Sequence, residues 1–318
     1  MQLSFQQIQS ITTGALRIWQ EADGIHFHRC TEQQSKAWYA IDEGLGWRGE
    51  STTGIRLDFH TNSKYFAFTV AKPGVFEVNL DGILRYSFTN YNGADFGDLR
   101  KEIPLDGEEH RITLFLPSHS AGVLQSVELS DGASFCRHTY DKKILFFGDS
   151  ITQGWDSKWD SLSFAYGVSH AFNAESVVQG IGGAIFHETP FDPAIDFDPD
   201  VVLVDYGTND WGHYKSLEEL REHCAIYLDL VAEKYAGKPI LAVTPIWRED
   251  IDQPKSMGTF EECTAIIREQ IVSHGLILLE GLTMVPHSMD FFADAVHPNA
   301  LGFGVYALRL IEEIRKYL

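Results

Sequence analysis

A serine follows a buried apolar strand near the middle of the chain. Residues 144–154 read ILFFGDSITQG, in which 144–147 are typical of an interior parallel strand that ends at Gly148. Ser150 then stands where a helix begins, so the N–H groups of the first helical turn face any anion formed beside its hydroxyl. This stretch alone leaves two interpretations open: a nucleophilic serine, or a helix N-cap, a position that serine often occupies.

Three later segments favour the nucleophile. Residues 177–184 (VVQGIGGA) and 201–210 (VVLVDYGTND) are apolar strands that run into glycine-containing turns, and residues 294–298 read DAVHP. Ligands of open α/β sheets bind beyond the carboxyl ends of the strands, so Ser150, Gly183 and Asn209 are expected at one rim. Asp294 and His297, three residues apart, suit a single turn.

These residue types meet the needs of acyl-ester chemistry. Ser150 is a weak nucleophile at neutral pH, and His297 can accept its proton. Asp294 can accept the other ring N–H and stabilise the imidazolium. The oxyanion needs donors placed beforehand, which the N–H groups of Ser150 and Gly183 and the side-chain amide of Asn209 can supply. The sequence therefore predicts a serine hydrolase site.

The four blocks, in this order, resemble those of the SGNH (GDSL-type) hydrolase family. Ser150, Gly183, Asn209 and His297 match its four signature residues one by one, within residues 141–318. The second block also contains Gly180 and Gly182, and Gly183 is chosen by its spacing from the strand. The absence of a G-x-S-x-G motif argues against an ordinary α/β-hydrolase. The resemblance implies a flavodoxin-like, three-layer α/β domain.

The hydrophobic period changes near residue 140, which predicts two domains. Before it, polar and apolar residues alternate in short segments separated by turn residues, near 15–19, 24–30, 54–60, 65–70, 75–80, 110–116 and 123–129. Alternation of this kind indicates one buried and one solvated face. We expect residues 1–140 to form an all-β, jelly-roll-type sandwich without long amphipathic helices.

After residue 140, apolar strands alternate with helical segments. The strands are expected near 143–147, 176–179, 201–206, 239–243 and 276–280, and the helices near 161–173, 216–235, 257–273 and 299–317. This order predicts a parallel sheet with helices on both faces over residues 141–318. A sandwich ahead of such a domain resembles the two-module layout of carbohydrate esterase family two.

The net charge and the composition of the chain limit the classes of partner that we expect the protein to bind. The chain of 318 residues carries a formal charge of −20, which disfavours nucleic acids and anionic membranes. Its first residues lack the features of a secretory signal, and no apolar run approaches the ~20 residues of a membrane span, so a cytoplasmic location is expected. Self-association into a homo-oligomer is left open.

Cysteine and histidine patterns predict neither disulfides nor a metal. The four cysteines are scattered without a C-x-x-C pair and are expected to be buried thiols. His26 and His28 share one face of a strand, but no carboxylate or cysteine nearby is expected to complete a ligand set. No cofactor is expected, because serine, histidine and fixed dipoles complete the mechanism.

Four side chains in the turns after the strands are candidates for lining the substrate pocket: Trp155, Trp211, Trp247 and Arg248. Aromatic rings there could stack on sugars, or pack between domains. Tyr39 and Trp47 are expected on loops of the sandwich.

The predicted function is a serine esterase that removes a small acyl group from a small-molecule or carbohydrate ester. The acyl group is expected to be acetyl. Two alternatives remain: a lysophospholipase or thioesterase, and a carbohydrate-binding protein with a vestigial hydrolase site.

Overall fold

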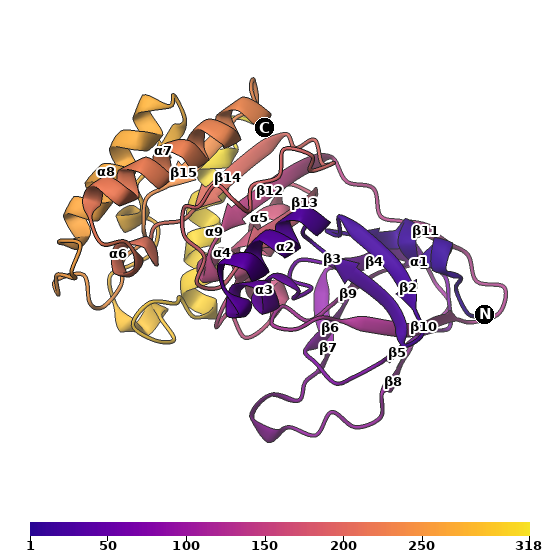
Figure 1. Ribbon diagram of the computed structural model, residues 1–318. Helices are drawn as coiled ribbons and strands as arrows, with labels where there is room; N and C mark the ends of the chain where they lie inside the picture. Colours follow the sequence, from indigo (N-terminus) through magenta and orange to yellow (C-terminus); the bar gives the residue numbers. More distant parts are fainter. The chain divides into compact units, whose positions relative to one another are not determined.

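The chain folds into two compact units, in a computed structural model that describes residues 1–318 apart from the side chain of Asn92. The first unit comprises Met1–Cys30, Glu50–Tyr140 and Trp159–Ser161, and the second comprises Thr31–Gly49, Asp141–Lys158 and Leu162–Leu318 (Figure 1). An all-β domain followed by an α/β domain confirms the predicted fold class. The division near residue 140 is present, but each unit also includes a short segment from the other side of it.

The first unit is an antiparallel β-sandwich. One sheet has the order β1-β4-β9-β6-β7, with β11 paired to β4, and the other has the order β2-β3-β10-β5-β8. Phe59 of β4 and Phe66 of β5 make an edge-to-face contact between the sheets at 5.7 Å and are completely buried. The elements are α1 (Phe5–Ile11), β1 (Thr12–Thr13), β2 (Arg17–Glu21), β3 (Gly24–His28), β4 (Arg56–Thr61), β5 (Tyr65–Val70), β6 (Phe76–Leu80), β7 (Ile83–Phe88), η1 (Tyr91–Gly93), β8 (Arg100–Pro104), β9 (His110–Phe115), β10 (Val123–Leu129) and β11 (Phe135–Arg137).

The second unit contains a five-stranded parallel sheet of order β13-β12-β14-β15-β16. This is the flavodoxin-like order, whose switch point lies between β12 and β14. The strands are β12 (Lys142–Gly148), β13 (Ala174–Gly180), β14 (Val201–Asp205), β15 (Ile240–Val243) and β16 (Ile277–Leu279). Gly148 pairs in register with Gly180 on one side and with Asp205 on the other. Strands β13, β12 and β14 therefore end level, and the turns that follow them start at one edge.

Helices cover both faces of this sheet. Phe146 of β12 contacts Phe164 of α5 at 6.1 Å, whereas the next residue, Phe147, contacts Tyr227 of α7 at 6.3 Å. Successive side chains of a strand point to opposite faces, so α5 and α7 lie on different faces. The helical elements after residue 141 are α4 (Ser150–Gln153), η2 (Asp160–Leu162), α5 (Phe164–Ala171), α6 (Asp210–His213), α7 (Leu217–Lys234), α8 (Phe260–Ser273), η3 (Gly281–Thr283), η4 (Met289–Phe291) and α9 (Ala300–Ile314).

Two helices that the sequence pattern did not predict, α2 (Glu32–Ile41) and α3 (Glu43–Gly49), belong to the second unit. A capping box starts α2, in which the Thr31 hydroxyl accepts from the Gln34 N–H and the Gln34 side chain accepts from the Thr31 N–H. Tyr39 and Trp47, expected on loops of the sandwich, therefore lie on α2 and α3. That expectation was wrong because the capping box at Thr31 and Gln34 starts a helix here in place of a loop.

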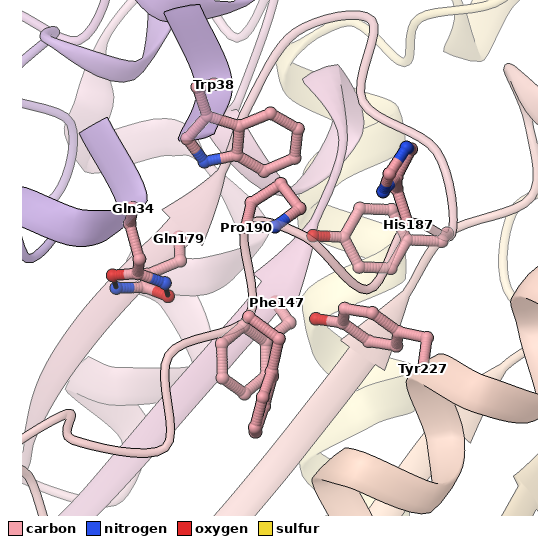
Figure 2. A pocket seen from close by; sticks show the side chains of 9 residues that line it. Gln34, Trp38, Phe147, Gln179, His187, Pro190 and Tyr227 are labelled. Carbon is pink, nitrogen blue, oxygen red and sulfur yellow. Dashed lines mark hydrogen bonds between the residues drawn. The ribbon is translucent and has the colours of Figure 1, made fainter. Parts of the chain in front are cut away.

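Buried polar contacts anchor α2 to the second unit. The amides of Gln34 and Gln179 of β13 form two reciprocal hydrogen bonds of 2.9 Å, and both side chains are buried (Figure 2). The Thr31 hydroxyl also donates to the Asp192 carboxylate at 2.5 Å. Beside this pair, Trp38 helps to enclose a void of about 10 Å³, close to the space of one water molecule. The α2–α3 hairpin is thus part of the second unit.

All four cysteines are free in the structure. Cys30, Cys224 and Cys263 are buried as expected, whereas Cys136 at the end of the sandwich is exposed, so the expectation of a buried thiol was wrong there.

Within the described part of the chain, no helix combines the length and apolarity needed to cross a membrane.

The amide pair predicts a specific stability effect. Replacing Gln34 by Ala leaves the Gln179 amide buried without its partner, which should lower the free energy of unfolding by about 1–3 kcal/mol. Urea unfolding of Gln34→Ala and of the exposed neighbour Gln33→Ala, measured side by side, checks this.

The double variant Gln34→Leu/Gln179→Leu removes both amides together. It should be closer to the wild type than Gln34→Ala, because neither amide is left buried without the other; the Thr31 N–H loses its Gln34 acceptor in both variants alike. Equal stability of Gln34→Ala and Gln33→Ala would show that the amide pair does not anchor α2.

Candidate active site

The first turn after β12 leaves the Ser150 hydroxyl available. The N-cap of α4 is Asp149, whose Oδ1 accepts from the Ile151 N–H at 2.8 Å. Ser150 is the first residue of the helix and is 6% exposed. The N-cap interpretation therefore belongs to Asp149, and the serine hydroxyl is directed to another partner.

That partner is a histidine held by an aspartate. The Ser150 Oγ lies 2.8 Å from Nε2 of His297, and Nδ1 of the same ring lies 2.8 Å from Oδ2 of Asp294. Oδ1 of Asp294 accepts from the backbone N–H groups of Val296 and His297, both at 2.7 Å. The Asp-x-x-His spacing thus folds into one tight turn that fixes the carboxylate against the ring.

A second carboxylate, missed by the sequence reasoning, faces the same ring. Oδ2 of Asp156 lies 3.7 Å from Nδ1 of His297, in a loop where Asp156 has a φ of +66°. Burial raises the pKa of Asp156, and the Asp294 charge adds to this rise. For Asp294, burial also raises the pKa, but hydrogen bonds from His297 and Val296 outweigh it and lower the pKa overall. Asp294 is therefore the better ionised partner of the imidazole.

Among the glycines of the second block, Gly183 has its N–H available. The Gly182 N–H donates to Oε1 of Gln153 at 2.7 Å, and Gly180 is the last residue of β13. Gly183 has a φ of +84°, a conformation that glycine adopts without strain. Within the described residues, neither the Gly183 N–H nor the Ser150 N–H donates to another group of the chain.

The side chain of Asn209 contacts the turns that follow β12 and β13. Its Nδ2 donates to the carbonyl of Ala184 at 3.0 Å, next to Gly183, and approaches Oδ2 of Asp149 at 3.4 Å, next to Ser150. The side-chain amide thus spans the turns after β12 and β13. One of its two hydrogens is held by Ala184, and the longer contact leaves the other only weakly engaged.

Three buried carboxyl groups lie beneath these turns: Asp149, Asp205 and Asp210. Burial raises the pKa of Asp205 to about 7 and that of Asp210 to about 7. Burial, reinforced by Asp205, also raises the pKa of Asp149. Oδ1 of Asp210 accepts from the Phe186 N–H at 2.9 Å, so this residue braces the second block.

Two of the four expected pocket residues are not available for substrate. Trp211 is completely buried, where it donates to the Gly258 carbonyl at 3.0 Å and packs on Phe260. Arg248 is 8% exposed and forms two hydrogen bonds with Asp250, at 2.5 and 3.0 Å. Its guanidinium also lies over the Trp211 ring and donates to the carbonyl of Thr208 at 3.0 Å, the residue before Asn209, so these contacts occupy it in place of an anionic ligand.

The other two expected residues lie closer to the histidine turn. The ring of Trp155 lies 6.4 Å from that of His297. Trp247 is partly buried and packs on His287 at 5.7 Å and Phe292 at 5.0 Å. Trp155 is thus the candidate whose ring lies beside His297.

In the sandwich, two carboxylates lie beside His26. Nε2 of His26 is 2.8 Å from Asp23 and 3.8 Å from Glu21. The sequence pattern predicted no nearby carboxylate to complete a ligand set, whereas Asp23 and Glu21 both lie within reach of the His26 ring. His28, by contrast, is buried and accepts from the Cys30 N–H.

The buried carboxyl groups predict a pH dependence of stability. As pH rises from about 4 to about 7, the unfolded chain releases the Asp210 proton while the folded chain keeps it, so the free energy of unfolding falls. Asp210→Asn removes one such proton and should reduce this slope by about 1.4 kcal/mol per pH unit. Denaturant unfolding between pH 4.5 and 7.5, with the exposed Asp252→Asn as control, checks this. An unchanged slope would show that Asp210 is ionised in the folded state.

Solved structures share the fold of the whole chain. A salicylyl-acyltransferase, SsfX3, from a tetracycline biosynthetic pathway superposes with a TM-score of 0.78 at 18% identity, covering 96% of this chain and 94% of that one. An acetyl xylan esterase, Est2A, of Butyrivibrio proteoclasticus gives 0.66 at 12% identity, covering 99% and 98%. A family two carbohydrate esterase of Clostridium thermocellum, in complex with cellohexaose, gives 0.66 at 15% identity, covering 84% and 93%.

No curated protein sequence matches the chain. The GDSL-like lipase/acylhydrolase family, however, matches residues 146–305, which include the nucleophile turn, both later turns and the histidine turn. That segment is half of the chain, and it is the part whose geometry brings Ser150, His297 and Asp294 together. The chain therefore belongs to the GDSL-like lipase/acylhydrolase family.

Proposed function

We propose that the protein is a serine esterase that hydrolyses small acyl esters, chiefly acetyl esters of carbohydrates, through a Ser150–His297–Asp294 triad. The observation that carries this proposal is the continuous hydrogen-bonded chain from serine to histidine to aspartate, with both links at 2.8 Å.

The first step is attack of Ser150 Oγ on the ester carbonyl. His297 Nε2 takes the serine proton as the Oγ–C bond forms, and Asp294 stabilises the resulting imidazolium through Nδ1. Two backbone N–H groups hold Asp294 in place, so the ring keeps the tautomer that leaves Nε2 able to accept a proton.

The carbonyl oxygen becomes an anion in this step and needs donors. The N–H groups of Ser150 and Gly183 and the loosely engaged hydrogen of the Asn209 amide are the proposed oxyanion hole. The contact of this hydrogen with Asp149 is long, at 3.4 Å, so the amide can donate to the oxyanion without giving up a strong hydrogen bond. Donors placed in advance stabilise the oxyanion without reorganising.

Collapse of the intermediate completes the transfer. The imidazolium returns its proton to the leaving alcohol, the C–O bond of the ester breaks, and the acyl group remains on Ser150. Water, deprotonated by His297, then attacks the acyl-enzyme, and the acid leaves as the serine regains its proton. With water as the second reactant, His297 and Ser150 accept and return every proton in these steps.

The substrate class rests on two supports. The fold over most of the chain is similar to that of a family two carbohydrate esterase and of an acetyl xylan esterase. Trp155, beside His297, provides an aromatic surface of the kind that stacks on sugar rings. A screen of acetyl, butyryl and octanoyl esters together with acetylated sugars tests this choice.

A second candidate is acyl transfer to an alcohol in place of water. The fold similarity to a salicylyl-acyltransferase over 96% of this chain favours it. The same acyl-enzyme serves both reactions, so the ratio of acid to transferred ester, measured with increasing acceptor alcohol, separates them.

Loss of the nucleophile should abolish activity. Ser150→Ala is expected to reduce ester hydrolysis to the background rate and to prevent labelling by a fluorophosphonate, because no other serine has His297 as its base. Ser273→Ala, at an exposed serine on α8, is the control and should behave as the wild type. A folded Ser150→Ala protein that keeps most of its activity would defeat the assignment.

Removing the side-chain amide of Asn209 should destabilise the transition state. Asn209→Ala is expected to lower kcat by about 10²–10³-fold with little change in KM, as removal of one oxyanion donor does. Steady-state kinetics on p-nitrophenyl acetate provide the measurement. A raised KM with kcat unchanged would assign Asn209 to substrate binding instead.

A further inference from the structure

Helix α3 places an arginine against the glycine turn of the second block. A Cβ built on Gly183 would lie 3.2 Å from Nη2 of Arg48 and 3.6 Å from Leu45, and a Cβ on Gly182 would lie 2.9 Å from Cδ of Arg48. The Arg48 side chain therefore covers this turn at van der Waals distance, along its stem as well as at its guanidinium.

The turn needs such support. Gly180, Gly182 and Gly183 fall within four residues, and glycine has more backbone freedom than any other residue. On one side, Gln153 of α4 accepts from the Gly182 N–H at 2.7 Å. Arg48 and Leu45 pack on the turn from α3, so the proposed oxyanion donor Gly183 is held between two helices.

The position of α3 is itself fixed. The preceding helix, α2, is joined to β13 of the sheet by the reciprocal Gln34–Gln179 amide pair (Figure 2). The Thr31 hydroxyl, at the N-cap of α2, also donates to Asp192 in the segment between β13 and β14. Ile181 lies against Gly49 at the end of α3, 3.7 Å from a Cβ built there. Arg48 thus approaches the turn from a rigid element and not from a loop.

The positive charge of Arg48 beside the Gly183 turn has a consequence for the proposed reaction. Residues 141–318 contain 13 basic and 28 acidic side chains, so a negative transition state forms in an acidic part of the chain. A guanidinium remains positively charged at any pH at which the protein is folded. Because the Arg48 guanidinium lies beside the Gly183 turn, its positive charge opposes the negative potential of the acidic side chains at the place where the carbonyl oxygen becomes an anion.

We infer that Arg48 is a positioning residue of the oxyanion hole, which holds the Gly182–Gly183 turn from the α3 side and supplies a fixed positive charge beside the oxyanion. This inference rests on the proposed esterase function and extends its machinery to a helix from the other half of the sequence.

The test compares Arg48→Met and Arg48→Lys in the full-length protein. The methionine keeps an apolar stem and removes the charge, whereas the lysine keeps the charge. Arg309→Met is the matched control, because Arg309 lies on α9, is 57% exposed and pairs with Glu312. Each variant is first compared with the wild type by thermal unfolding, and Arg48→Gln replaces Arg48→Met if that variant does not fold.

Two readouts separate a role in the oxyanion hole from a structural one. One is kcat and KM on p-nitrophenyl acetate, a neutral ester that offers no anion to Arg48. The other is the rate at which a fluorophosphonate modifies Ser150, followed by intact mass. In that reaction the serine oxygen bonds to phosphorus as fluoride leaves, and the phosphonyl oxygen occupies the oxyanion position.

Arg48→Met is expected to lower both kcat and the labelling rate by about 10–100-fold, with KM changed less than about threefold. Arg48→Lys should recover most of the loss, and Arg309→Met should match the wild type.

Three results would overturn the inference: equal rates for Arg48→Met and the control, a raised KM with unchanged kcat, or no recovery in folded Arg48→Lys. If the wild type itself is neither labelled at Ser150 nor active on any ester, the proposed function fails, and the inference fails with it. Labelling of the wild type with no effect of Arg48 overturns the inference alone.

Discussion

The level carboxyl ends of β13, β12 and β14 determine where the polar turns of this protein meet. Gly148 pairs with Gly180 on one side and with Asp205 on the other, so all three strands finish at the same edge of the sheet. A shift of one residue in either pairing would move a turn along the strand axis by about 3.3 Å, more than a hydrogen bond can span. The contacts of Asn209 with both neighbouring turns depend on this register.

Buried polar groups then orient the side chains at that edge. Asp149 caps α4 and leaves the serine hydroxyl to His297, and Asp210 accepts from the Phe186 N–H behind the glycine turn. Burial raises the pKa of both carboxyl groups, which reduces the charge held beneath a site where an anion must form. The Gln34–Gln179 pair extends the same support to a helical hairpin from the N-terminal half of the sequence.

Sequence patterns predicted the residues that follow strand ends, because strand length and turn glycines are local signals. Ser150, Gly183, Asn209 and the Asp294–His297 turn are of this kind. Burial is not a local property, so Trp211 and Arg248 were expected near the rim but are packed beneath it. The hairpin was missed because the Gln34–Gln179 pair that anchors it joins residues far apart in the sequence, which leaves no local pattern. Asp156 gave no spacing signal, since its approach to His297 depends on a loop with a positive φ.

The most direct test of this mechanism is a crystal structure of the protein after reaction with a fluorophosphonate. The phosphorus should be bonded to Ser150 Oγ, with one phosphonyl oxygen within about 3.1 Å of the Ser150 N–H, the Gly183 N–H and Nδ2 of Asn209. His297 should keep its contact with Asp294. A phosphonyl oxygen directed away from these three donors, or a label on another residue, would contradict the proposed site.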